Sequence, residues 1–382
     1  MAKRVPYGMV GGGVGAFIGD VHRKAISFDQ RAKLVAGSFS IIHSENIETG
    51  ELYSIDPSRV YQSYNEMAEK ESARPDGIRF VSITTPNHTH YDIARSFLEF
   101  GINVVCEKPL CFTASQGEEL QALTKKNDLL FGMTYSYSGY VMVKVMREMV
   151  QGGKIGEIIA VNAEYPQEWL IDQLGNDNPG TAKLSGWRSD PKVAGISNCV
   201  GDIGSHIEHT VHYITGLKIK RLLATVNRFG KPLDLNANII LEYENGANGA
   251  YWCSQVACGA LNALRVRIYG TEGSLEWDQH FPDYVRYTPK GSAPQTLSRG
   301  CGYLAESVAS ANRLPSGHPE GLYVAFANIY RNYINAVVKK DAGESLTETD
   351  LDFPKVSDGL GGVKFIHAAI ESGDNGSKWV EL

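Results

Sequence analysis

One short stretch of the chain contains most of its candidate chemistry. The residues GDIGSHIEHTVHYITG (201–216) include Asp202, His206, His209 and His212. On a helix, Asp202 and His206 are four residues and about 40° apart, so both side chains lie on one face. Histidine is the side chain best suited to proton transfer near neutral pH. The stretch alone fits a proton relay, a metal site or a structural role.

The metal alternative lacks further ligands in the sequence. His209 could join Asp202 and His206 on one face, but no distant His/Cys cluster has metal-ligand spacing. The six cysteines contain no C-x-x-C pair, so they fit neither a zinc knuckle nor a disulfide framework and indicate a reducing compartment. His212 is rotated by about 240° from His206, which favours a structural role. We therefore expect a proton relay and no bound metal.

The composition is that of a globular protein. With 382 residues the chain exceeds one ordinary core, so we expect two domains. The net charge of -6 argues against a nucleic-acid partner. No run of about 18 apolar residues is present, so we expect no membrane span. The N-terminus carries no signal-peptide pattern, which predicts a cytoplasmic protein.

Strand and helix patterns alternate over about the first 135 residues, which predicts βαβ units and a parallel sheet. Thr113 is a suitable N-cap for a helix, and Gly101 follows the end of the preceding one. The expected strands are at 5–10, 34–39, 78–85, 102–107 and 129–135, and the expected helices begin near 90 and 114.

From about residue 155 the pattern changes to longer antiparallel strands. Asn245-Gly246 lies between two of them, which is a strong hairpin signal. The irregular stretches 167–200 and 289–321 are too long for simple connections, so we expect them to shape a site. Helices are expected over 322–340 and near 358–371.

A glycine-rich segment follows the first strand and precedes a helix. In VGGGVGAFIG, the residues Gly11, Gly13 and Ala16 fit the G-x-G-x-x-A pattern, in which the backbone approaches a pyrophosphate at a helix N-terminus. Gly19 is an alternative third glycine if the loop carries an insertion. We expect the loop to contact a dinucleotide through Gly11, Gly13, Val14, Gly15 and Ala16.

The end of the second strand lacks the acidic residue that usually binds the ribose of NAD. Ser38 and Ser40 occupy this position, and no arginine follows at once for the phosphate of NADP. The cofactor is therefore NAD or NADP. NAD is favoured, because a hydroxyl can bind a ribose but cannot neutralise a phosphate.

Several motifs together resemble the Gfo/Idh/MocA family, named for glucose–fructose oxidoreductase, inositol dehydrogenase and a rhizopine catabolism protein. The E-K-P of VVCEKPL (104–110) lies at the end of a strand, where ligands of open α/β sheets bind. The motifs occur in the same order as in the family and span nearly the whole chain. They are the glycine loop, TTPNHTH (84–90), E-K-P, GWRSDP (186–191), GDIGSH (201–206) and YGTEGSLEW (269–277).

The resemblance implies an α/β Rossmann nucleotide-binding domain followed by an α+β domain built on a large, mainly antiparallel open sheet. We place these over 1–137 and 138–356, with a C-terminal segment 357–382 that returns to pack on the Rossmann domain. It also implies a homodimer or homotetramer formed through the outer face of the second sheet. The implied activity is reversible hydride transfer between a nicotinamide and a sugar or cyclitol carbon.

The family's motifs also imply roles for individual residues. Lys108 matches the lysine of E-K-P, and Asp202 and His206 match the D-x-x-x-H pair. His206 would be the acid/base, Lys108 would stabilise alkoxide charge, and Asp202 would orient the pair or a substrate hydroxyl. Further cofactor contacts are expected from Thr85, Pro86, Asn87, His90 and Glu107.

The substrate contacts are expected from four further residues: Tyr135, Trp187, Arg188 and His209. Tyr135 follows the last Rossmann strand, where the family often has an arginine, which favours a neutral substrate. His209 replaces a second Asp of the family and either lines the pocket or packs in the core. Two other functions stay open: an NAD-dependent glycosidase that oxidises its sugar transiently, and a non-catalytic NAD(P) sensor.

Overall fold

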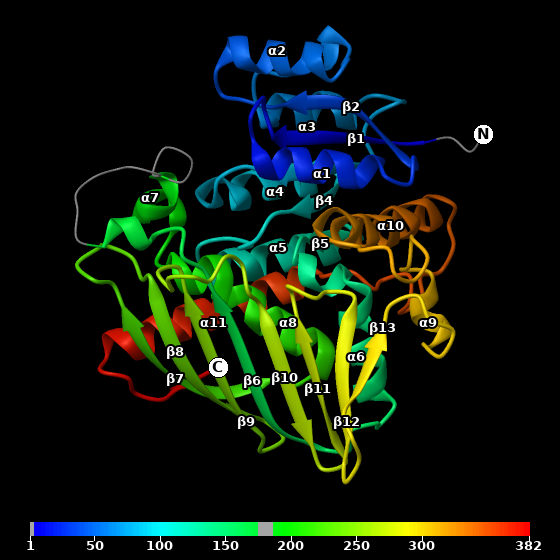
Figure 1. Ribbon diagram of the computed structural model, residues 1–382. Helices are drawn as coiled ribbons and strands as arrows, with labels where there is room; N and C mark the ends of the chain where they lie inside the picture. The colour runs from blue at the N-terminus through cyan, green and yellow to red at the C-terminus, as the bar shows by residue number, and fades with distance from the viewer. Residues whose placement is uncertain (1–3, 175–185) are drawn as a thin grey trace. The chain divides into compact units, whose positions relative to one another are not determined.

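The computed structural model describes residues 4–174 and 186–382 (Figure 1). Part of the irregular stretch 167–200 lies outside these residues, because 175–185 are not among them. The chain divides into two compact units. The first comprises Met1–Gly139 and Leu322–Leu360, and the second comprises Tyr140–Gly321 and Gly361–Leu382.

The first unit contains a five-stranded sheet in the order β2-β1-β3-β4-β5. All of its described pairs are parallel, as the sequence predicts. The strand order reverses direction between β1 and β3, so the carboxyl ends of these strands mark the place where such sheets bind ligands. The strands are β1 (Val5–Gly11), β2 (Ala32–Ser38), β3 (Phe80–Thr84), β4 (Asn103–Cys106) and β5 (Phe131–Met133).

Two helix boundaries of the first unit lie where the sequence predicts them. Thr113 and Gln116 form a complete capping box at the start of α5, and Gly101 has a φ of +74° just past α4. Both predicted helix boundaries are therefore confirmed. The helices are α1 (Phe17–Ser27), α2 (His43–Leu52), α3 (Tyr64–Ser72), α4 (His90–Glu99), α5 (Ala114–Lys126) and α10 (Leu322–Asp341).

Helix α10 belongs to the first unit, which corrects the expected domain boundary at 356. Its buried side chains Phe326, Tyr330 and Tyr333 pack in one core with Tyr7 of β1 and Phe80 of β3. Large aromatic rings contribute the greatest apolar area to such a core. The helix therefore packs with the parallel sheet although about 190 residues separate it from β5 in sequence.

The second unit contains a nine-stranded sheet in the order β13-β12-β11-β10-β6-β9-β8-β7-β14. The pair β6·β9 is parallel and the other described pairs are antiparallel. Gly246, with a φ of +88°, lies in the predicted hairpin between β8 and β9. The strands are β6 (Ile158–Pro166), β7 (Ile219–Asn227), β8 (Asn236–Tyr243), β9 (Asn248–Ser254), β10 (Arg265–Gly270), β11 (Gly273–Asp278), β12 (Tyr284–Pro289), β13 (Gln295–Ser298) and β14 (Val380–Glu381).

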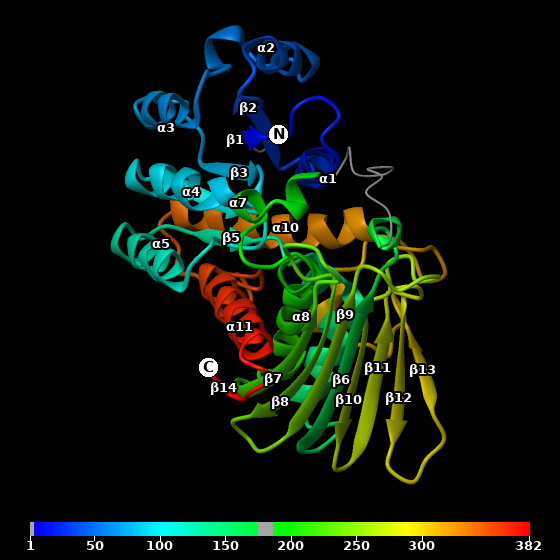
Figure 2. The same ribbon diagram turned by 90° about the vertical axis from the view of Figure 1, so that its left-hand side faces the viewer.

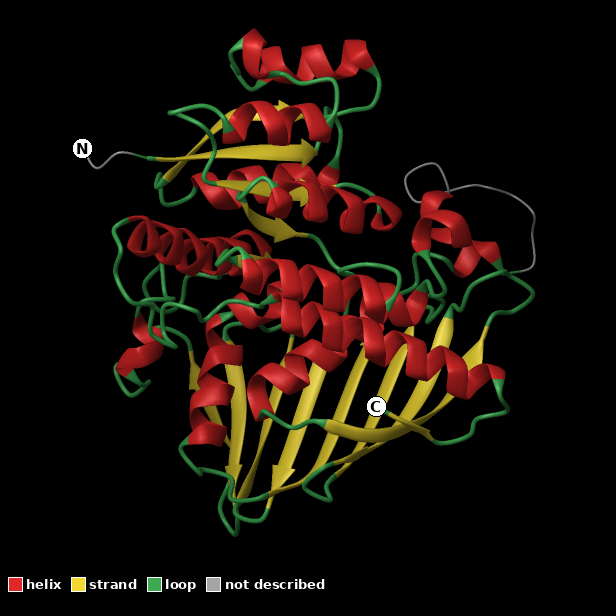
Figure 3. Cartoon of the chain, turned by 180° about the vertical axis from the view of Figure 1, so that it is seen from behind, coloured by secondary structure: helices red, strands yellow, loops and turns green. Residues whose placement is uncertain are grey.

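One face of this sheet is covered by helices (Figures 2 and 3). These helices are α6 (Val141–Gln151), α8 (Ser205–Thr215) and most of α11 (Val356–Asp374); the unit also contains the short helices α7 (Pro191–Ala194) and α9 (Glu306–Ala309). No described helix lies over the opposite face in Figure 1. There Ile240 of β8 and Tyr269 of β10 are exposed.

The segment 357–382 was expected to pack on the Rossmann domain, but its residues from Gly361 onwards belong to the second unit. Phe365 packs against Tyr251 of β9, and Oγ of Ser372 accepts a hydrogen bond from the backbone N–H of Ala224 in β7. The chain then adds β14 to the edge of the same sheet. The reason is the apolar face of α11, which covers this sheet.

None of the described helices has the length and apolarity that a membrane crossing requires.

The structure resolves which glycine acts as the third one of the glycine loop. A Cβ added to Gly19 of α1 would lie 2.2 Å from Cα of Gly12. Only glycine therefore allows helix α1 to lie this close to the loop that follows β1. The match of Ala16 to this position is corrected, and the loop carries the insertion considered as the alternative.

We expect Gly19→Ala to destabilise the protein by about 1–3 kcal/mol, because the methyl group forces the helix away from the loop. Gly361→Ala is the matched control, since Gly361 also lies within a helix but an added Cβ there meets nothing within 4 Å. The control should be neutral or stabilising, because alanine favours helix more than glycine does. Thermal unfolding measures both variants. Equal Tm values would contradict the packing role of Gly19.

Candidate active site

The glycine loop of the first unit has the conformation of a phosphate cradle. Gly11 has a φ of +80°, and a Cβ there would lie within 3.0 Å of Thr84. Gly15 also has a φ of +80°, but the space around it is open. The loop leads to Ala16, the N-cap of α1, so the first N–H groups of the helix are directed at the loop. These residues fit the pyrophosphate of a dinucleotide.

At the end of β2 the structure provides an acidic residue that the sequence analysis missed. Ser38 is buried, whereas the hydroxyl of Ser40 donates a 2.7 Å hydrogen bond to Oε2 of Glu45 in α2. Glu45 was missed because an acid is expected directly at the end of the strand, and here it follows seven residues later. The hydrogen bond from Ser40 thus holds the negatively charged carboxylate of Glu45 close to the end of β2.

The segment TTPNHTH continues from β3 into a short 3-10 turn over Asn87–Thr89. Thr85, Pro86 and Asn87 are partly exposed at the carboxyl end of β3, where they stay predicted cofactor contacts. His90 corrects the expectation, because it is fully buried and its Nδ1 and Nε2 lie 2.7 and 2.8 Å from the carbonyl oxygens of Pro109 and Thr85. Burial lowers its pKa. The ring therefore joins two loops and has no nitrogen left for a cofactor.

Lys108 is partly exposed directly after β4, and its peptide bond to Pro109 is cis. The side chain of the preceding Glu107 also departs from the expected cofactor contact. Its Oε1 accepts hydrogen bonds from Nε2 of His22 at 2.8 Å and from Thr134 at 2.5 Å, and Oε2 accepts one from the N–H of Lys108 at 3.3 Å. Both carboxylate oxygens are thus bonded within the protein.

In the second unit, Asp202 lies in a π-helical turn over Val200–Gly204, which runs directly into α8. This placement excludes Asp202 as a simple N-cap, since the residue is inside a helix. Such turns are rare and frequently occur at functional sites. His206 lies in the first turn of α8, and its ring is 6.3 Å from that of Tyr165 in β6.

The carboxylate of Asp202 is held by two side chains from distant parts of the second unit. Nε2 of Gln255 donates to its Oδ2 at 3.0 Å, and Nε of Arg188 lies 3.8 Å from Oδ1. Arg188 also stacks over the ring of Trp187, 4.5 Å from its centre. The structure thus brings together Arg188 and Asp202, two residues for which the sequence analysis predicted separate roles, and adds Gln255.

A buried carboxylate fixes the loop that leads into this helix. Asp234 is fully buried and accepts hydrogen bonds from the N–H groups of Asn198 and Val200 at 2.8 and 2.7 Å. Burial is the largest effect on Asp234 and raises its pKa. The sequence analysis missed Asp234 as well as Gln255, because neither lies in a recognisable motif.

The other expected substrate contacts are buried. His209 is only 2 % exposed, and its ring stacks with Tyr213 one turn further along α8. Tyr135, in the first unit, is fully buried after β5. Both therefore fit packing roles, and their contact with a substrate stays a prediction.

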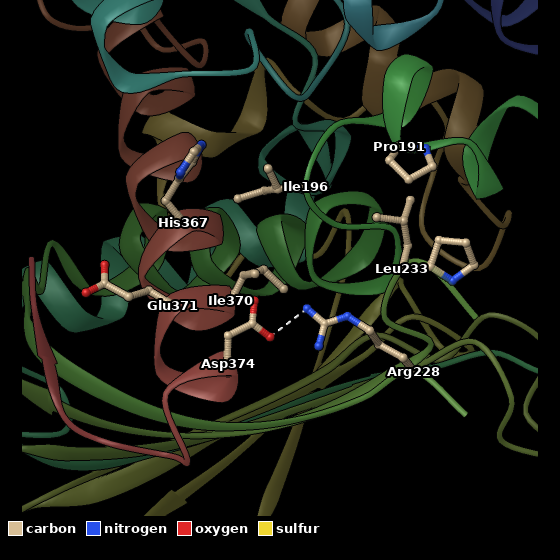
Figure 4. A pocket seen from close by; sticks show the side chains of 9 residues that line it. Pro191, Ile196, Arg228, Leu233, His367, Ile370, Glu371 and Asp374 are labelled. Atoms are coloured by element: carbon tan, nitrogen blue, oxygen red, sulfur yellow. Dashed lines mark ion pairs between the residues drawn. The ribbon is translucent and has the colours of Figure 1, made fainter. Parts of the chain in front are cut away.

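A pocket of about 450 Å³ lies elsewhere in the second unit, beside α11 (Figure 4). Its cationic Arg228 is paired with Asp374 at 2.7 Å. None of the predicted site residues lines it; the lining consists of Pro191, Ile196, Arg228, Pro232, Leu233, His367, Ile370, Glu371 and Asp374. Over residues 4–174 and 186–382, no cluster of three His, Cys, Asp or Glu side chains has an arrangement that would hold a metal ion.

Comparison with known proteins identifies both parts of the chain. Residues 5–135 match the oxidoreductase family with an NAD-binding Rossmann fold, and residues 143–276 match the GFO/IDH/MocA C-terminal domain. The uncharacterized oxidoreductase YfiI of Bacillus subtilis is 36% identical over 100% of this chain and 98% of its own length.

The chain is also similar to a solved structure that contains a bound cofactor. The inositol dehydrogenase homologue of Azotobacter vinelandii, complexed with NADH and myo-inositol, is 35% identical with a TM-score of 0.92, over 100% of this chain and 98% of its own. The levoglucosan dehydrogenase of Pseudarthrobacter phenanthrenivorans is 27% identical over 56% of this chain and 58% of its own length. With its phosphate cradle and both matched domains, this chain belongs to the Gfo/Idh/MocA family of NAD-binding oxidoreductases.

Proposed function

We propose that this oxidoreductase transfers a hydride between the nicotinamide and a ring hydroxyl or ketone carbon of a neutral cyclitol or sugar. The observation that carries the proposal is the held carboxylate of Asp202, one helical turn before His206. A carboxylate fixed by an amide and near a guanidinium is suited to orient a hydroxyl group or a histidine. A surface aspartate would have no need of these two partners.

His206 is the proposed acid/base. When the alcohol is oxidised, the carbon loses a hydride and the hydroxyl oxygen loses a proton, which a ring nitrogen of His206 accepts. Bound NAD supplies the hydride acceptor. In the reverse direction, the protonated histidine returns the proton to the ketone oxygen.

Lys108 is proposed to stabilise the negative charge that develops on the substrate oxygen. A fixed ammonium group does this at no cost of reorganisation during the reaction. Support comes from its position directly after β4, at the edge of the sheet where open α/β domains bind ligands. Glu107 and Pro109 hold the backbone on both sides of Lys108 through their hydrogen bonds.

A neutral polyol is the proposed substrate class. Arg188 lies close enough to Asp202 that a carboxylate of this protein already offsets its charge, so it offers no free charge for an anionic substrate. The homologue complexed with myo-inositol is 35% identical over the whole chain, whereas solved levoglucosan dehydrogenase is 20% identical over 99% of it. We therefore propose a cyclitol first and a sugar second.

NAD is proposed as the preferred cofactor over NADP. The carboxylate of Glu45, bonded to Ser40, places a negative charge at the loop that follows β2. A ribose hydroxyl can donate to that carboxylate, but the phosphate of NADP would be repelled by it.

The uncovered face of the nine-stranded sheet is the proposed surface for a homodimer or homotetramer. Ile240 and Tyr269 are exposed on two strands of this face. Large apolar residues grouped on a sheet face are typical of association surfaces. Light scattering would give the number of copies.

The function is tested by following NADH absorbance with NAD or NADP and a panel of cyclitols, free sugars and aryl glycosides. Reduction of NAD by one of the cyclitols or sugars is the expected result. Release of the aglycone from a glycoside without net NADH would instead establish the redox glycosidase. No turnover of any compound would contradict both.

We expect Lys108→Met to lower kcat about 100- to 1,000-fold with a smaller change in KM, because alkoxide charge exists only near the transition state. Lys125→Met, at an exposed position on α5, is the control and should leave kcat unchanged. Steady-state kinetics with the identified substrate measure both variants. A normal kcat in the Lys108→Met enzyme would contradict the proposed role of Lys108 in stabilising alkoxide charge.

We expect Glu45→Gln to raise kcat/KM for NADP relative to NAD about five- to tenfold, because it removes about 1 kcal/mol or more of charge repulsion. Glu48→Gln, one turn further along α2 and likewise exposed, is the matched control. The ratio of kcat/KM for the two cofactors is measured for each variant. An equal shift in both variants would show that only the net charge of the helix matters.

A further inference from the structure

A histidine that the proposed chemistry does not use is buried next to the E-K-P segment. His22 lies in the second turn of α1 and is fully buried. Its Nε2 is 2.8 Å from Oε1 of Glu107. Its Nδ1 is 2.7 Å from the hydroxyl of Tyr330 in α10 and 3.1 Å from Oγ of Ser82 in β3. The ring thus links four elements of the first unit.

The chemistry of the partners fixes the direction of these hydrogen bonds. Burial alone would raise the pKa of Glu107, but the hydrogen bond from His22, the charge of Lys108 and the hydrogen bond from Thr134 contribute to lowering it to about 2. Glu107 is therefore an ionised acceptor, and Nε2 of His22 must donate to it. Burial raises the pKa of Tyr330, so its hydroxyl keeps its proton and can donate to Nδ1.

Ser82 completes the sequence of donors. Its Oγ lies 2.9 Å from the Tyr330 hydroxyl, so Ser82 can donate to Tyr330, Tyr330 to His22 and His22 to Glu107. Each member then has a donor or acceptor partner, which is required of buried polar groups. The carboxylate that ends this chain also accepts from the backbone N–H of Lys108.

We propose that His22 is a positioning residue for Lys108, acting through the buried carboxylate of Glu107. Its role is to keep that carboxylate in one place, which fixes the backbone and the electrostatic surroundings of the lysine. The kinetic test of this proposal rests on the proposed hydride transfer. The stability test needs no substrate, so a wrong role for His22 can be distinguished from a wrong proposed function.

Two substitutions of His22 separate its hydrogen bonds from its bulk. His22→Leu removes both nitrogens, whereas the amide of His22→Gln can still donate to Glu107 and accept from Tyr330. We expect His22→Leu to lower kcat about 10- to 100-fold with little change in KM for NAD, since a small misplacement of a catalytic group has effects of this size. His22→Gln should restore most of kcat. Equal loss in both variants would overturn the proposal.

A pair of hydroxyl deletions on α10 provides the matched control. Tyr330→Phe removes a donor to His22 and should lower kcat, whereas Tyr333→Phe removes a hydroxyl that donates to the backbone carbonyls of Val104 and Leu130. Both residues are fully buried on one helix, so both variants lose stability. An equal kcat in these two variants would overturn the proposal.

The decisive kinetic experiment combines His22→Leu with Lys108→Met. If His22 acts through Lys108, its substitution has little further effect on kcat once the ammonium group is absent. The full His22→Leu loss in the Lys108→Met background would show that the two residues act independently, which would overturn the proposal.

The stability experiment measures Tm against pH without substrate. The titratable groups that face Glu107 come from several elements. They are His22 of α1, His90 of α4, Tyr330 of α10, and Cys106 and Lys108 on either side of Glu107 in the chain. In the natural protein the low pKa of Glu107 contributes stability above the ordinary carboxyl pKa, which is lost as the pH falls toward about 2.

Without His22, burial raises the pKa of Glu107, so the folded protein binds that proton more tightly than the unfolded chain. The Tm deficit of His22→Leu should therefore grow as the pH rises from about 4.5 to 7. In the double variant with Glu107→Gln this pH dependence should disappear. A deficit independent of pH would show that His22 does not hold the ionised carboxylate, and the proposal would fail.

Discussion

A buried carboxylate must find most of its hydrogen-bond donors inside the protein, and this constraint organises the first unit around Glu107. An unpaired buried charge costs several kcal/mol, so the surrounding elements have to bring donors to it. His22 of α1 and Thr134, which directly follows β5, both donate hydrogen bonds to it. Because α1 also begins at the glycine loop, the same interaction that satisfies Glu107 fixes the start of the dinucleotide cradle relative to Lys108.

The features that sequence reasoning predicted correctly depend on residues close together in the chain. The capping box of Thr113 spans three residues, and the hairpin at Asn245-Gly246 spans a few more. The spacing of Asp202 and His206 is also local, but the π-helical turn that carries Asp202 was not predicted.

The features that it missed depend on contacts between distant residues. His22 is 85 residues from Glu107 and 308 from Tyr330, and Gln255 is 53 residues from Asp202. One signal for His22 was present: a histidine beside Val21 on the buried face of α1 needs a partner, but the sequence does not say which one. The boundary near 356 failed similarly, because an amphipathic helix shows which face it buries and not which sheet it covers.

The turn that carries Asp202 is stabilised from outside rather than by its own sequence. A π-helical turn is intrinsically uncommon, and here Asp234 holds the chain just before it through two backbone N–H groups. The side-chain oxygens of Asn198 and Gln255 are buried there without a hydrogen-bond partner among the described residues. Such groups cost about 1–3 kcal/mol each. A fold that keeps them beside an oriented carboxylate gives up stability at that point, as folds do where they hold a functional site.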